Sequence, residues 1–308
     1  MSIAPRTLLP AAALLISLAL PTLTQAEDYD LVFDRPHEVG ARYAVSGEAY
    51  INEEVHQRVN GETTEEQSSV SEVNMAGTLE VLVVNDAGGV SQFALTVGEY
   101  DIEINDEGIE LQQDRRIIGG VEGGEATFRY ENGDAIEGDL AELLDTLLDD
   151  FLDDHGDGGQ SDEMMNLDGS KSPGDRWEMN HDYMVQQAIE DGELTLDPDQ
   201  IESEVHFVGV NENNDFGIPM AVIEMSLRTE GFAFPTDGFP EWMEIKESYI
   251  ELEAGGMLPI DPTSHQTRHE NEFEMAFLAT GEVPGQGVRV EVEVESNRGS
   301  ALTVRELP

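Results

Sequence analysis

Four aspartates that follow an apolar stretch could supply oxygen ligands to a metal ion. They are Asp153, Asp154, Asp157 and Asp162. Calcium is bound by carboxylate and carbonyl oxygens. An EF-hand loop that began at Asp153 would place His155 third and Met164 twelfth, where that loop needs oxygen ligands, so we reject an EF-hand. A water-rich calcium contact through the four aspartates and a solvated linker remain as the two alternatives.

Two histidines form the second candidate for metal chemistry. His265 and His269 lie four residues apart, with Glu270 and Glu272 close behind them. On a strand they would face the same side, but the spacing is not H-E-x-x-H and no third histidine follows from the pattern. A zinc-dependent hydrolase and an ordinary pair at the end of a strand are both compatible with this spacing.

Aromatic residues are concentrated in the stretch GFAFPTDGFPEW, which two prolines interrupt. The candidate ligand-binding residues in it are Phe232, Phe234, Phe239 and Trp242. These side chains could anchor a loop in the core, or they could form an apolar lid over a pocket. The sequence contains no G-x-S-x-G, P-loop or dinucleotide-binding motif. Carboxylates are too numerous to indicate acid–base catalysis, so whether the protein is an enzyme stays open, and we favour a non-enzymatic protein.

The elements that must position these residues are mainly β-strands, because apolar and polar residues alternate along most of the chain. The alternation over residues 42–59 is so long that this strand should be curved or broken, with Gly47 the candidate break. Residues 79–84 and 90–97 flank a turn, and so do residues 204–210 and 218–227. The apolar parity changes at Gly98–Glu99, which predicts a β-bulge there. The fold class is therefore antiparallel β, with curved sheets that have one dry face.

One amphipathic helix is predicted at about 139–153. Its apolar residues follow the helical spacing and are Leu140, Leu143, Leu144, Leu147, Leu148, Phe151 and Leu152. Such a stripe must be covered, and the simplest cover is the apolar face of the sheet. Acidic residues crowd the end of this helix, where the helix dipole favours cations.

A short internal repeat suggests two duplicated halves. Gly40, Arg42 and Tyr43 match Gly174, Arg176 and Trp177, and a long strand is expected after each set. We therefore divide the chain into a β half at 27–153 that ends in the helix, an acidic Gly/Asp-rich linker at 154–173, and a second β half at 174–308.

The first 26 residues have the features of a secretory signal peptide, with Arg6, an apolar stretch and a small-residue end at Ala26. No later apolar stretch approaches the length of a membrane span. The chain carries 15 Lys and Arg against 66 Asp and Glu, a net charge of −51. Such charge repels nucleic acid and anionic lipid and is typical of proteins from salty water. We expect an exported protein, periplasmic or extracellular, of a marine or halophilic bacterium. No cysteine is present, so disulfides and Cys–zinc sites are excluded.

The chain resembles the periplasmic lipoprotein-carrier (LolA/LolB-like) half-barrel proteins in four features. These are a leader, long curved antiparallel strands, one leucine-rich helix and the lack of a catalytic motif. The resemblance concerns architecture and identifies no motif residues. It implies a concave sheet lined with apolar residues that could hold a lipid-like ligand. We therefore expect an exported, non-enzymatic envelope protein whose partner is an apolar small molecule or another envelope protein. A calcium-stabilised extracellular interaction module is the first alternative, and a metal-dependent hydrolase is the second. No cofactor other than calcium is expected.

Overall fold

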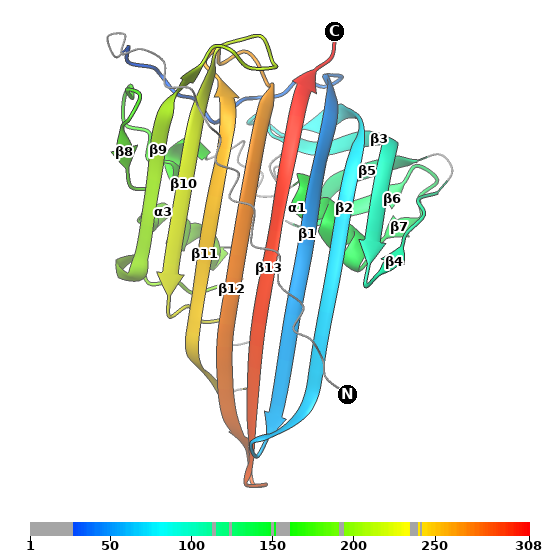
Figure 1. Ribbon diagram of the computed structural model, residues 1–308, viewed down its shortest axis with the longest axis vertical. Coiled ribbons are helices and arrows are strands. Elements are labelled where there is room, and N and C mark those ends of the chain that lie inside the picture. Colours follow the sequence, from blue (N-terminus) through cyan, green and yellow to red (C-terminus); the bar gives the residue numbers. More distant parts are fainter. Residues whose placement is uncertain are drawn as a thin grey trace, which may run out of the picture.

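The computed structural model describes residues 27–112, 115–122, 125–148, 151, 161–190, 194–234, 240 and 242–308. In these residues the chain forms one large, curved antiparallel sheet of thirteen strands that does not close on itself (Figure 1). The mainly β fold expected from the alternating pattern is therefore confirmed. No helix in the described ranges is both long enough and apolar enough to cross a membrane.

The strands fall into two groups along the chain. The first group is β1 (Arg42–Val59), β2 (Glu62–Val84), β3 (Val90–Ile104), β4 (Glu107–Gly108), β5 (Arg116–Glu122), β6 (Glu125–Tyr130) and β7 (Ala135–Ile136). The second group is β8 (Arg176–Trp177), β9 (Ile201–Asn211), β10 (Met220–Glu230), β11 (Met243–Pro259), β12 (Thr267–Val283) and β13 (Val288–Glu306). The order across the sheet is β7-β6-β5-β3-β2-β1-β13-β12-β11-β10-β9-β8, and β4 pairs with β3.

The first and last long strands meet at the centre of the sheet. β1 pairs with β13 from Tyr43↔Glu306 to Val59↔Val290, and this pairing joins the two groups into a single sheet. The pairing of β1 is unbroken at Gly47 on both sides, so the break expected there is wrong. The register of β1 against β2 shifts only between Gln57 and Arg58.

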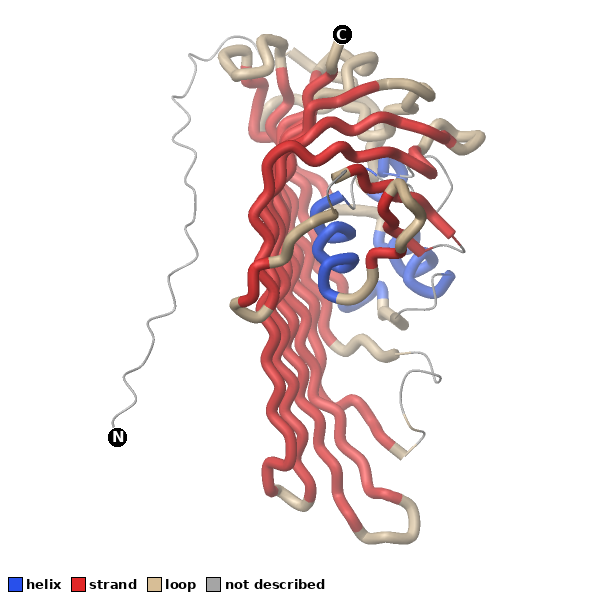
Figure 2. The backbone as a smooth tube through the Cα atoms, turned by 90° about the vertical axis from the view of Figure 1, so that its right-hand side faces the viewer, coloured by secondary structure: helices blue, strands red, loops and turns tan. Residues whose placement is uncertain are grey.

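The described helices lie on one side of the sheet, as Figure 2 shows. They are α1 (Asp139–Leu148), α2 (Ser161–Met164) and α3 (His181–Glu190), and a 3₁₀-turn, η2 (Pro198–Gln200), precedes β9. We call the covered side of the sheet the helix side and the opposite side the open face. The lower ends of the central strands extend beyond the helices.

Helix α1 packs on the apolar face of the sheet, as its leucine spacing predicted. Leu143, Leu144, Leu147 and Leu148 are all buried, and the helix contacts β1, β2, β6 and β13. Gly47 has a structural role here. A Cβ atom at this position would lie 2.9 Å from Cδ1 of Leu147 and 2.4 Å from the carbonyl oxygen of Ala301, so glycine allows the helix to approach β1 closely.

The local features predicted in the strands are present. Ala76 pairs with Glu99 and Gly77 pairs with Val97, so Gly98 is the extra residue of a β-bulge where the parity changes. The turns between β2 and β3 and between β9 and β10 also occur where the turn residues predicted them. Alternation is clear in β12, in which Phe273, Met275 and Phe277 are more buried than Glu272 and Glu274.

The second half departs from the predicted repeat. The long strand expected after Gly174, Arg176 and Trp177 is wrong, because β8 has only two residues and helix α3 follows it. Trp177 directs its indole N–H to the carbonyl oxygen of Met165, 2.6 Å away. The segment that contains Trp177 therefore forms the edge of the sheet next to β9.

Residues 27–41 form a strap that ties the two halves together. Tyr29 pairs with Lys171, and Leu31 is buried against the second half of the sheet. At the other end of the strap, the N–H of His37 donates to the carbonyl oxygen of Gly88 in the turn between β2 and β3. The strap therefore bridges the predicted halves. Of the predicted linker 154–173, the described part begins with α2 at Ser161 and contributes the buried Met165 to the core.

Candidate functional site

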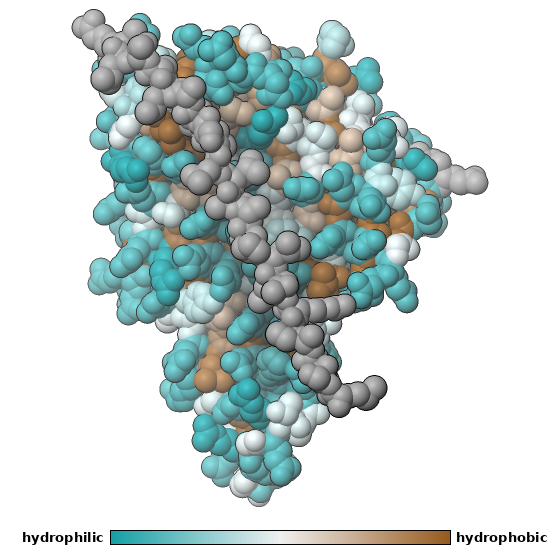
Figure 3. Space-filling model, viewed as in Figure 1, coloured by the Kyte–Doolittle hydropathy of each residue, from teal (hydrophilic) through white to brown (hydrophobic). Residues whose placement is uncertain are grey.

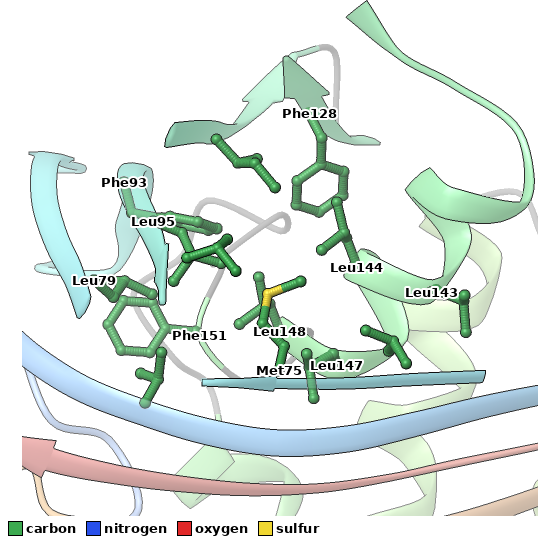
Figure 4. Close-up of a cluster of buried hydrophobic side chains, with 14 of the residues drawn as sticks. Met75, Leu79, Phe93, Leu95, Phe128, Leu143, Leu144, Leu147, Leu148 and Phe151 are labelled. Atoms are coloured by element: carbon green, nitrogen blue, oxygen red, sulfur yellow. The ribbon is translucent and has the colours of Figure 1, made fainter. Parts of the chain in front are cut away.

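Two apolar clusters lie on the helix side, and they differ in how completely they are covered. Among the described residues, the first-half cluster contains twenty-five buried side chains and nine partly buried ones. The second-half cluster contains thirteen buried side chains and twenty partly buried ones. The first-half cluster is therefore a well-buried core (Figure 4), whereas the second-half cluster is an apolar surface that remains partly accessible to solvent.

The second-half cluster is also rich in methionine. Seven of the eleven methionines of the chain belong to it, namely Met164, Met165, Met179, Met184, Met225, Met243 and Met275, whereas Met75 belongs to the first cluster. Methionine is flexible and polarisable, so it adapts to partners of different shape. This composition suits a surface that binds apolar molecules better than it suits a rigid core.

The predicted aromatic residues are placed partly in this cluster. Phe232 is 2% exposed, its carbonyl oxygen accepts a hydrogen bond from Ser248, and its ring lies 5.5 Å from the ring of Phe234. The ring of Phe234 lies 5.1 Å from that of Phe277 on β12. Trp242 packs over Gly281, where a Cβ atom would be 2.7 Å from the indole. Phe239 lies outside the described residues.

The aspartates predicted to bind calcium are mostly outside the described ranges. Asp153, Asp154 and Asp157 all lie there, so calcium at these residues stays a prediction. Asp162 is described, and its Oδ1 accepts the backbone N–H of Phe33 at 2.6 Å. This carboxylate therefore holds the strap. Within the described part of the chain, no group of three or more His, Asp or Glu side chains could hold a metal ion.

The two histidines predicted to bind metal have different surroundings. The backbone N–H of His265 donates to Glu306, and its ring Nε2 lies 3.0 Å from the carbonyl oxygen of Pro36. His269 lies within β12, opposite Leu302 and Gly256. His265 therefore belongs to the contact between the strap and the end of the sheet, and the metal-dependent hydrolase stays a prediction.

His37 and His265 form a ring contact between residues that lie far apart in the sequence. Their ring centroids are 4.7 Å apart, and Nδ1 of His37 lies 2.9 Å from the hydroxyl of the buried Tyr43. Burial, followed by the charge of His265, lowers the pKa of His37 to about 4. Burial, followed by the charges of Glu306 and Glu38, raises the pKa of Tyr43 to about 12. Both groups are therefore neutral at pH 7.

Acidification should weaken the fold through His37. The unfolded chain, with an ordinary histidine pKa of ~6.5, takes up this proton more readily than the folded chain does. Between pH ~6.5 and ~4, the free energy of unfolding should fall by up to about 3 kcal/mol from this group. Urea unfolding of the wild type and of His37→Gln across this range isolates the effect, because the many carboxylates titrate equally in both. A difference between the two proteins that stays constant with pH would contradict it.

A groove of about 900 Å³ lies on the open face of the sheet, and its lining is mostly acidic rather than apolar. The described atoms of this face are largely hydrophilic (Figure 3). Small residues of β10, β11 and β13 lie along it, namely Ser226, Gly255, Gly299 and Ala301. Nine carboxylates line it, and they are Glu48, Glu72, Asp101, Glu103, Glu204, Glu224, Glu253, Glu270 and Glu272. Arg176 is the one arginine or lysine in the lining. This groove disfavours anions by charge repulsion. In the sequence, the groove could have been indicated by small residues at open-face positions of these strands, such as Gly299 and Ala301 on β13.

No protein-family model and no curated protein matches this sequence. A structure described as lipid–protein interactions in lipovitellin aligns with 88% of this chain at a TM-score of 0.31 and 9% identity. The alignment spans 26% of the lipovitellin chain. The outer membrane protein OprG of Pseudomonas aeruginosa aligns with 88% of this chain and 99% of its own, at a TM-score of 0.20 and 7% identity. Similarity at this level does not establish a shared fold.

Proposed function

We propose that this chain is an exported, non-enzymatic binding protein of the bacterial envelope that takes an apolar or lipid-like ligand on its helix side. The observation that carries the proposal is the difference in cover between the two apolar clusters. The ligand surface is the second-half cluster, because its side chains are mostly only partly buried. The leader-like residues 1–26 support export.

The strands of this surface provide a continuous apolar row. Phe273, Met275 and Phe277 share one face of β12, and Leu252 and Ile250 lie opposite the first two on β11. Five consecutive strand residues cover ~13 Å at 3.3 Å per residue, which suits an alkyl chain lying along the strand. Apolar area removed from water contributes roughly 25 cal/mol per Å², so covering this row favours binding.

Binding of an uncharged apolar probe tests the proposal. We expect the wild type to bind Nile red and to release it when dodecanol is added. Met275→Gln should weaken dodecanol binding by about tenfold, because an amide would be buried without a partner. Leu278→Gln is the matched control, since Leu278 lies on the open face of the same strand, and it should leave binding unchanged. Absence of binding to the wild type would refute the proposal.

A further inference from the structure

Arg298 lies where the two apolar clusters meet on the helix side. In the register of the sheet, Arg298 of β13 stands between Ile51 of β1, in the first cluster, and Phe273 of β12, in the second. Ser296 and Ser300, which share its strand parity, are buried, whereas Arg298 itself is exposed. Its guanidinium carbon lies 4.7 Å from the centre of the Phe273 ring. An accessible cation therefore stands at the border of the partly covered apolar surface.

The position of Arg298 is unusual among the arginines of the described strands. The other nine have open-face parity, and they are Arg42, Arg58, Arg116, Arg129, Arg176, Arg228, Arg268, Arg289 and Arg305. Several of these pair with carboxylates, as Arg58 does with Glu291 and Glu293. Within the described residues, Arg298 has its ring contact with Phe273 and no salt bridge. Glu53, opposite Ser296, is the nearest helix-side carboxylate of β1 in register.

We propose that Arg298 binds the carboxylate of a fatty acid whose alkyl chain lies on the second-half apolar cluster. This inference rests on the proposed function and adds the chemical class of the ligand. Charge complementarity favours an anionic ligand on the helix side. The carboxylates of the open face repel an anion, whereas the guanidinium of Arg298, which has no salt bridge among the described residues, attracts it.

The geometry of Arg298 suits a carboxylate. A guanidinium that lies over an aromatic ring makes this contact without a hydrogen bond to a carboxylate, so its N–H groups can still donate to one. These N–H groups match the two oxygens of a carboxylate and form charge-assisted hydrogen bonds with them. The row from Phe273 through Met275 to Phe277 begins beside the guanidinium, so the head group and the chain of one molecule can be bound together.

Three amphiphiles with the same alkyl chain and different head groups test this inference. Titration calorimetry at one high salt concentration should show that the wild type binds laurate about tenfold more tightly than dodecanol. Arg298→Gln should remove that preference and leave dodecanol binding unchanged. Arg298→Lys, which keeps the charge and loses the planar fork, should retain part of the preference. Arg289→Gln is the control, because Arg289 is an exposed open-face arginine of the same strand.

The outcomes separate this inference from the proposed function. If the wild type binds neither laurate nor dodecanol, the proposed function fails. If it binds both equally, or if a folded Arg298→Gln retains the preference for laurate, the role of Arg298 is refuted and the apolar surface stands. Tighter binding of dodecyltrimethylammonium than of laurate would also overturn it. If Arg298→Gln does not fold, the laurate-to-dodecanol ratios of the wild type and of Arg298→Lys decide.

Discussion

Leu144→Ala should lower the free energy of unfolding by about 2–5 kcal/mol, because it truncates a fully buried side chain in the first-half cluster. Leu144 is 0% exposed and faces the first-half cluster, as Figure 4 shows. The loss combines the transfer free energy of the removed atoms with the cost of the remaining cavity. Chemical denaturation at high salt measures it.

Leu140→Ala is the matched control for this prediction. Leu140 lies on the same helix and is only partly buried, so its substitution should cost clearly less than that of Leu144. Equal losses at the two positions would contradict the prediction, because alanine favours the helix slightly more than leucine at both of them and only the packing against the sheet differs.

Arg35→Gln should destabilise the protein by roughly 3 kcal/mol, because one guanidinium satisfies four backbone carbonyls. The two terminal nitrogens of Arg35 donate to the carbonyl oxygens of Val32, Pro259, Asp261 and Ser264 at 2.7–2.9 Å. The loss of these bonds leaves partly buried acceptors unpaired and frees the strap from the turn between β11 and β12.

Thermal unfolding together with limited proteolysis measures this effect. Cleavage within residues 27–41 should accelerate in Arg35→Gln before the sheet unfolds, because the strap is released first. Arg42→Gln is the control, since Arg42 is an exposed open-face residue of β1. Unchanged protease resistance of the strap in folded Arg35→Gln would contradict the prediction.

Local patterns predicted the strands and the bulge because each is determined by a few neighbouring residues. The parity change at Gly98 is visible in the sequence because one extra residue exchanges the two faces of a strand. The leucine spacing of α1 is equally local. The pairing of β1 with β13 could not be predicted in this way, because its register joins residues at opposite ends of the chain. Helix α3 was missed because the apparent repeat favoured a strand after Trp177.

The candidate site was predictable only in part. The aromatic stretch drew attention to Phe232 and Phe234, which do lie in the partly covered cluster. Arg298 was not among the predicted site residues. The sequence did contain a signal for it, since Arg298 has the same strand parity as the apolar residues Val290, Val294 and Val304. A charged residue at an apolar position of an otherwise regular strand is an indicator of function that alternation alone does not reveal.

The central pairing of β1 with β13 has a consequence for biosynthesis. Until residues 288–306 emerge from the ribosome, β1 has only β2 as a neighbour, and the middle of the sheet cannot assemble. Contacts so distant along the chain form slowly, because loop closure must precede them. The central hydrogen-bonded ladder therefore forms after the hairpins on either side of it, which pair strands that are neighbours along the chain.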